Sequence, residues 1–91
     1  MPRYLIERTF EDTLAIPMND VGRRFTGMVI KNNASAGVTW IHSYVTADRK
    51  QSFCVYDAPT PQALRDAATR NELPIGRITE VNVLNPYFYL P

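Results

Sequence analysis

The sequence contains one cysteine, one histidine and no long apolar run among its 91 residues. A single cysteine cannot form a disulfide within the chain, so nothing points to an oxidising compartment. Without a long apolar run, a membrane-spanning helix is not expected. The net charge is only +1, whereas a nucleic-acid-binding domain normally carries a strongly basic face. These absences predict a protein that has neither a membrane nor a nucleic acid as its partner.

The length and composition are those of one small globular domain. The chain is 45% hydrophobic and 21% charged, which predicts a single domain over residues 1–91 with a modest core. A chain this short often completes the burial of its apolar surface by forming an oligomer. A strand-like pattern begins almost at Met1, so we expect no signal peptide and a cytoplasmic protein.

Periodicity and turn residues predict six regular elements. The expected strands are residues 4–10, 38–45, 52–57 and 78–84, the expected helices are 20–33 and 61–71, and the main loops are 11–18 and 47–49. Asn19 or Asp20 can cap the first helix, Gly37 can end it in a left-handed conformation, and Thr60-Pro61 is a typical helix start. The order β-α-β-β-α-β predicts an α+β, ferredoxin-like fold with a four-stranded antiparallel sheet in the strand order 4-1-3-2.

Alternation along the strands assigns the side chains to two faces of this sheet. The face expected beneath the helices carries Tyr4, Ile6, Ile41, Val45, Phe53, Val55, Val81 and Val83. The other face is expected to carry Leu5, Glu7, Trp40, His42, Tyr44, Cys54, Tyr56, Ile78, Glu80 and Asn82. Because this second face would be bare and aromatic in a monomer, we predict a homodimer in which two sheets pack together as a dimeric α+β barrel. The aromatic tail, residues 86–91, is expected to pack on the partner or over the open end of the sheet.

His42 and Cys54 are the leading candidates for a functional site. A hairpin about Asp48 is expected to bring His42 opposite Cys54, and Glu7 has the parity to join them. Imidazole and thiolate together favour nickel, zinc, copper or iron over magnesium or calcium. We therefore predict a metal site formed by His42, Cys54 and Glu7, with Glu80 flanking Glu7 as a weaker candidate.

Each of these residues also has an ordinary structural interpretation. A lone histidine can be a hydrogen-bonded interface residue, and a free cysteine is often a small buried hydrophobe. Glu7 can form an ion pair with an arginine such as Arg3, Arg8 or Arg77. The metal site therefore depends on the expected pairing of the two hairpin strands.

The aromatic side chains Trp40, Tyr44 and Tyr56 support two further interpretations. They could line a pocket for a small-molecule ligand, or they could pack in the dimer interface. A pocket between the sheets would favour a small dimeric α+β barrel enzyme in which Glu7 or His42 acts as an acid or base. A third possibility is an interaction module whose open face binds another protein.

Four segments of the chain resemble a bacterial family of domains of unknown function whose members are often described as nickel-binding proteins. These segments are PRYLIER at 2–8, VTWIHSYV at 38–45, FCVYDAP at 53–59 and ITEV at 78–81. The resemblance covers nearly the whole chain and implies a dimeric ferredoxin-like fold. It also implies a metal site that uses His42 and Cys54. Nickel-binding relatives can carry a histidine where this chain has Glu7, so the third ligand and the identity of the metal stay open.

Overall fold

A computed structural model of the chain describes residues 1–12, 14, 16 and 18–89. The elements follow the predicted order: β1 (Arg3–Thr9), α1 (Asp20–Ser35), β2 (Thr39–Val45), β3 (Gln51–Asp57), α2 (Pro61–Asn71), β4 (Ile78–Val81) and a final 3₁₀ turn, η1 (Pro86–Tyr89). The last strand is shorter than predicted. The expected loop at 11–18 includes residues 13, 15 and 17, and the tail includes residues 90 and 91, which lie outside the described residues.

Local capping explains where the two helices begin. The side chain of Asn19 accepts hydrogen bonds from the backbone N–H groups of Val21 and Gly22, at 3.0 and 3.2 Å. At the start of α2, the Thr60 hydroxyl accepts a hydrogen bond from the N–H of Ala63 at 3.2 Å, and proline occupies the first turn. These side chains satisfy N–H groups that have no partner within the helix.

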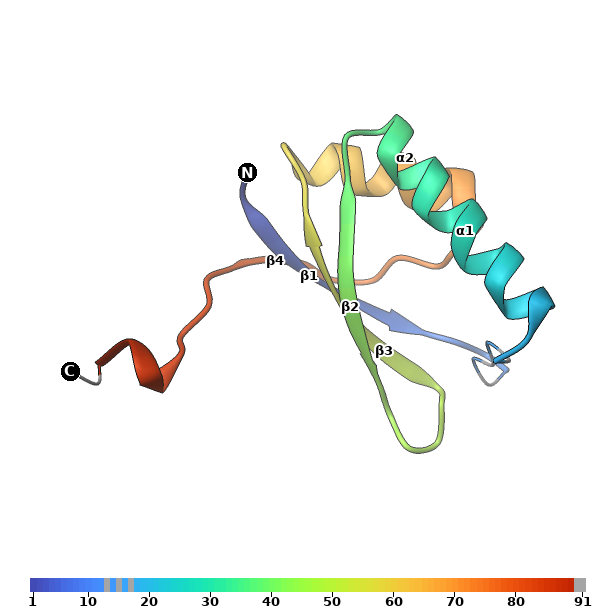
Figure 1. Cartoon of the computed structure of the whole chain (residues 1–91), viewed down its shortest axis with the longest axis horizontal. Coiled ribbons are helices and arrows are strands. Elements are labelled where there is room, and N and C mark those ends of the chain that lie inside the picture. Colours follow the sequence, from blue (N-terminus) through green and yellow to red (C-terminus); the bar gives the residue numbers. More distant parts are fainter. Residues whose placement is uncertain (13, 15, 17, 90–91) are drawn as a thin grey trace.

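The four strands form one antiparallel sheet in the order β2-β3-β1-β4, and both helices cover the same face of it (Figure 1). This confirms the α+β, ferredoxin-like arrangement. We call the covered side the helix face and the uncovered side the open face. Among the described residues, no helix is long and apolar enough to cross a membrane.

The pairing of β1 with β3 decides which side chains lie on each face. Ile6 is opposite Cys54 and Tyr4 is opposite Tyr56, and all four are buried on the helix face. The prediction that Phe53 and Val55 lie beneath the helices is therefore wrong. The run Ser-Phe-Cys-Val-Tyr offers apolar side chains on both faces, so its composition does not indicate which face is buried. A shift of one residue in register exchanges the two faces of a strand.

An irregularity in β2 changes its alternation. Trp40 pairs with Tyr56, but His42 pairs with Val55, so Ile41 is an extra residue between the two pairs. Such a β-bulge moves the following side chains to the opposite parity. Trp40 consequently lies on the helix face, whereas His42 lies on the open face, and the expectation that the two share a face is wrong.

The strand β4 corrects three further assignments. Ile78 pairs with Ile6 and Glu80 pairs with Tyr4, so both belong to the helix-face parity rather than to the open face. Val81, expected beneath the helices, pairs with Arg3 on the open face. Asn82 and Val83 follow the end of the strand and have no place in its alternation.

The core lies between the helix face and the two helices. Ile6 and Leu64 are fully buried at its centre, and α2 also buries Ala67 and Ala68 on the same side as Leu64. In α1 Val29 is buried, while its neighbour Met28 is 47% exposed. A buried hydrogen bond from Asn71 Nδ2 to Asn33 Oδ1, 3.0 Å long, joins the two helices where their apolar contact is narrow.

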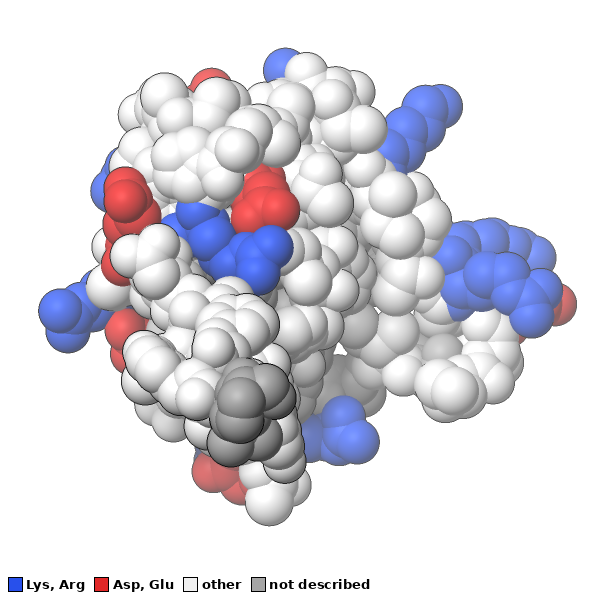
Figure 2. All heavy atoms as spheres, turned by 60° about the vertical axis from the view of Figure 1, so that its left-hand side comes forward, with Lys and Arg blue, Asp and Glu red and all other residues white. Residues whose placement is uncertain are grey.

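The open face has apolar side chains at its centre together with the charged residues Arg3, Glu7 and Asp57, and no element of the described chain covers it. Its half-buried side chains include Leu5, Phe53, Val55 and Val81, and His42 and Tyr44 are exposed at its β2 edge. Figure 2, which brings the tail side of Figure 1 forward, shows a largely uncharged surface with Lys, Arg, Asp and Glu in small separate groups.

The tail extends away from the body of the molecule (Figure 1). Tyr87, Phe88 and Tyr89 of η1 are 73%, 71% and 76% exposed. The described part of the tail therefore does not cover the chain's own sheet, and the prediction that it packs over the open end of the sheet is wrong. Its packing on a partner stays a prediction.

Gly76 provides a test of the connection that enters β4. Its N–H donates to the Glu7 carbonyl at 3.0 Å, and a Cβ added at Gly76 would lie 2.6 Å from that oxygen. We expect Gly76→Ala to lower the free energy of unfolding by about 1–3 kcal/mol through this clash. Urea unfolding followed by circular dichroism measures the change.

The control for this prediction is Gly27→Ala in the exposed part of α1. A Cβ at Gly27 meets no atom within 4 Å. Alanine should stabilise the helix there by about 0.5–1 kcal/mol. Equal effects of the two substitutions would contradict the close approach of Gly76 to β1.

Candidate functional site

The structure places His42 and Cys54 on opposite faces of the sheet. His42 is exposed on the open face, where its ring meets the Tyr44 ring edge-on at 5.1 Å. Cys54 is only 6% exposed and belongs to the core, opposite Ser43 of β2 and Ile6 of β1. The predicted cross-strand pairing of the imidazole with the thiol is therefore wrong.

Glu7 does lie on the open face, as predicted, but it is not adjacent to His42. It pairs with Phe53, and β3 separates it from β2, so the two backbones are about 10 Å apart. Glu80 does not flank Glu7, since it pairs with Tyr4. Within the described residues, no three His, Cys, Asp or Glu side chains gather closely enough to hold a metal ion. The residues of one copy therefore do not form the predicted metal site.

Two of the three predicted pocket residues line a cavity, but the cavity is on the helix face. Trp40 and Tyr56 line it, whereas Tyr44 is 65% exposed on the other side of the sheet. The cavity has a volume of about 230 Å³. Its lining consists of strand residues from β1, β2 and β3 facing apolar residues from α1 and the two connecting segments: Arg8, Phe10, Leu14, Ile16, Phe25, Val29, Trp40, Ser43, Val45, Ser52, Cys54, Tyr56 and Leu73.

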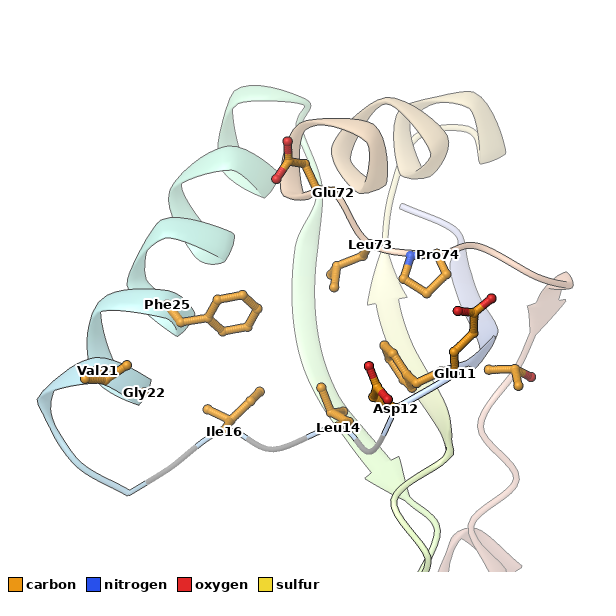
Figure 3. Close-up of a pocket in the computed structure, with 12 residues that line it drawn as sticks. Glu11, Asp12, Leu14, Ile16, Val21, Gly22, Phe25, Glu72, Leu73 and Pro74 are labelled. Atoms are coloured by element: carbon orange, nitrogen blue, oxygen red, sulfur yellow. The ribbon is translucent and has the colours of Figure 1, made fainter.

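A larger cavity of about 710 Å³ adjoins it and shares five lining residues, namely Phe10, Leu14, Ile16, Phe25 and Leu73. Figure 3 shows Phe25 from α1 and Leu73 from the segment after α2 pointing into this space, with Ile16 and Leu14 below them. Acidic side chains line only the larger cavity; they are Glu11, Asp12 and Glu72. The two cavities together form one cleft with an apolar middle.

Arg8 is the residue of this cleft that the sequence analysis did not single out. It is 5% exposed, its Nε donates to the Pro74 carbonyl at 2.9 Å, and its Nη1 donates to the Tyr56 hydroxyl at 3.3 Å. The guanidinium also lies over the Tyr56 ring, 5.6 Å from its centre. Strand alternation could have indicated its burial. Arg8 follows Tyr4 and Ile6 at a spacing of two, and residues so spaced in a strand lie on the same face.

The polar groups beside Arg8 are mostly paired with one another. The Trp40 indole N–H donates to the Ser43 hydroxyl at 2.9 Å, and the Cys54 thiol donates to the Ser52 hydroxyl at 3.4 Å. Burial raises the pKa of the Tyr56 hydroxyl, an effect that the neighbouring Arg8 charge only partly offsets. Tyr56 is therefore a neutral hydrogen-bonding group at physiological pH.

A surface ion pair joins the ends of β1 and β3. Arg3 Nε and Nη2 donate to the two carboxylate oxygens of Asp57 at 2.9 and 3.3 Å. The pair is partly exposed, with 36% and 28% of its side chains accessible. The hydrogen bond from Arg3 lowers the pKa of Asp57 below its usual range.

The comparisons with known proteins agree with this fold. The family model described as nickel responsive protein SCO4226-like matches residues 4–81. The crystal structure of SCO4226 from Streptomyces coelicolor A3(2) superposes with a TM-score of 0.72 at 11% identity, over 91% of this chain and 99% of the other. At that identity the superposition establishes the fold alone. No curated protein matches the sequence.

The Arg3–Asp57 pair predicts a specific pH dependence of stability. Because the pKa of Asp57 in the folded chain lies below its ordinary value of 3.8, the pair stabilises the fold above that pH. The stabilisation is lost as the pH falls through the lowered value. We expect Asp57→Asn to flatten the decline of the unfolding free energy below pH 4, measured by urea titrations at several pH values.

Arg3→Gln is the matched variant, since it removes the same pair from the other side. In both variants the unfolding free energy should still decline with falling pH, but less steeply than in the wild type. This smaller slope remains because the Thr46 hydroxyl lowers the pKa of Asp48 in the β2–β3 turn. A wild-type slope in Asp57→Asn would contradict the role of the pair.

Proposed function

Since the chain belongs to the SCO4226-like family of nickel responsive proteins, we propose that it binds nickel or a similar transition metal through His42 at an interface between two copies. The observation that carries this proposal is the position of the only imidazole of the chain. His42 is exposed on an apolar sheet face that the two helices leave uncovered.

The open face supports a homodimer as the functional form. A sheet face with Leu5, Phe53, Val55 and Val81 on it is costly to leave in water, and large exposed apolar patches commonly mark an interface. A second copy is the simplest partner, because a two-fold axis pairs the same patch with itself. The exposed aromatic tail, with Tyr87 to Tyr89 in η1, offers further apolar area to that partner.

The dimer would also supply the donor groups that one chain lacks. One copy contributes His42 and Glu7 to the open face from two different strands. A two-fold interface doubles each donor, so two imidazoles and two carboxylates become available on the paired faces. Imidazole with oxygen donors is a set that nickel accepts, and zinc, copper and iron use the same nitrogen ligand. The proposal leaves Cys54 out of this site, because Cys54 belongs to the core on the other face of the sheet.

The metal proposal is tested by titrating untagged protein with Ni²⁺ in a calorimeter. His42→Ala should bind at least about tenfold more weakly than the wild type, because it removes a nitrogen ligand. Glu7→Gln, which keeps the side-chain shape, should also weaken binding. Cys54→Ala is the matched control on the other face and should bind as the wild type does.

Two outcomes would contradict this metal site. One is unchanged nickel affinity in His42→Ala. The other is a loss of affinity in Cys54→Ala, provided that its circular dichroism spectrum shows a native fold. The second result would indicate that the Cys54 thiol is a metal ligand, which would require a different arrangement of β3.

The dimer is tested separately by sedimentation velocity in a metal-free buffer. Val55→Lys places a charge in the centre of the open face and should convert the dimer to a monomer. Met28→Lys adds the same charge on the exposed side of α1, where Met28 is 47% accessible, and should stay dimeric. A monomeric wild-type protein, or a dimer that only Met28→Lys disrupts, would contradict packing through the open face.

A further inference from the structure

The helix-face cavity has the composition of a ligand site rather than of an ordinary packing defect. Its walls are apolar, with Phe10, Phe25, Val29 and Leu73 among them, while its strand side carries polar groups. A small number of converging polar groups in an apolar cavity is the usual form of a small-molecule site. The most unusual of these groups is the buried guanidinium of Arg8.

Arg8 has no acidic partner among the described residues. The only ion pairs found there are Arg3–Asp57 and Arg23–Asp20. The hydrogen bonds of Arg8 go to two neutral oxygens, the Pro74 carbonyl and the Tyr56 hydroxyl. A buried cation is normally matched by an anion, because its removal from water costs several kcal/mol. The positive charge at the cavity wall therefore lacks its complement.

We propose that the cavity binds a small organic acid that places one carboxylate at Arg8 and Tyr56 and its apolar body against Phe25, Val29 and Leu73. A guanidinium is the side chain best suited to holding a carboxylate. The Tyr56 hydroxyl accepts a hydrogen bond from Arg8 and carries a proton of its own that it can donate to the ligand. This site lies on the opposite side of the sheet from His42 and goes beyond the proposed metal function.

The charges around the cleft restrict the class of acid. Glu11, Asp12 and Glu72 line the adjoining cavity and would repel a second negative charge on the ligand. Although these carboxylates are exposed, they favour a ligand with a single carboxylate that lies at the Arg8 end. The volume of about 230 Å³ suits a body the size of a medium-length alkyl chain or one aromatic ring.

The test uses wild-type protein in the presence of a metal chelator and three probes: octanoate, 4-phenylbutanoate and 1-octanol. Binding is followed by ¹H–¹⁵N correlation spectra, in which the indole N–H of Trp40, the only tryptophan, reports on the cavity. At least one carboxylate should shift this signal saturably. Octanol should bind at least about tenfold more weakly than octanoate, since it lacks the charge that Arg8 recognises.

Variants separate recognition from a structural role of Arg8. Tyr56→Phe keeps the aromatic ring and should weaken carboxylate binding severalfold, while Arg8→Gln should weaken it at least about tenfold. Arg3→Gln removes an arginine on the open face and is the matched control, with unchanged binding expected. His42→Ala should also bind the acid normally, which keeps this result independent of the metal proposal.

Three results would overturn the proposal. The first is the absence of any saturable Trp40 shift with either carboxylate, and the second is equal affinity for octanol and octanoate. The third is wild-type carboxylate affinity in both Tyr56→Phe and a folded Arg8→Gln. If Arg8→Gln does not fold, Tyr56→Phe decides alone. In each of these cases Arg8 serves only to attach the Pro74 segment to the sheet.

Discussion

The register between β1 and β3 is the constraint on which the rest of the structure depends. With Ile6 opposite Cys54, the side chains of Tyr4, Ile6 and Arg8 lie under the helices together with Ser52, Cys54 and Tyr56. A shift of one residue would instead bury Phe53 and Val55 and expose the thiol. The positions of Arg8, Cys54 and Tyr56 therefore follow from this one backbone pairing, whereas the position of His42 depends also on the bulge in β2.

This register gives the two faces of the sheet different chemical properties. The open face combines aliphatic side chains with the exposed His42 imidazole and suits contact with a second copy. The helix face contains a cavity with a buried cation at its wall. Because the sheet separates them, a metal on one side and an organic acid on the other would not compete for ligands. Membership in a nickel responsive family supports the metal proposal made for the first face, whereas the proposal for the second face depends on the geometry of the cavity alone.

The sequence was sufficient to predict the fold because its elements have strong local signals. Asn19 and Thr60 cap the helices as expected, Gly37 adopts a φ of 73°, and the β-α-β-β-α-β order fixes the strand arrangement. The faces were harder to predict. In β3, apolar residues at every position from Phe53 to Tyr56 hide the alternation that would indicate its buried side. In β2, the extra residue Ile41 is a property of the pairing with β3 and has no signature in the residues themselves.

The same limits explain the error in the predicted site. His42 and Cys54 are both on the predicted strands, but their relative orientation depends on the bulge and on the register, neither of which the sequence defines. Arg8 was overlooked because a charged residue in an alternating strand is normally assigned to solvent. Its burial becomes understandable only when Pro74 and Tyr56, both distant in sequence, are found to accept its hydrogen bonds.

The most direct test of the account is a measurement of proton–proton contacts across the three strands by nuclear Overhauser spectroscopy. Side chains of directly opposed residues have Cβ atoms about 5 Å apart, which is within the range of the method. We expect contacts from the Cys54 β-protons to Ile6, and from the His42 ring protons to Val55. A contact between the His42 ring and the Cys54 β-protons, with none between Cys54 and Ile6, would place the imidazole and the thiol on one face and contradict the account.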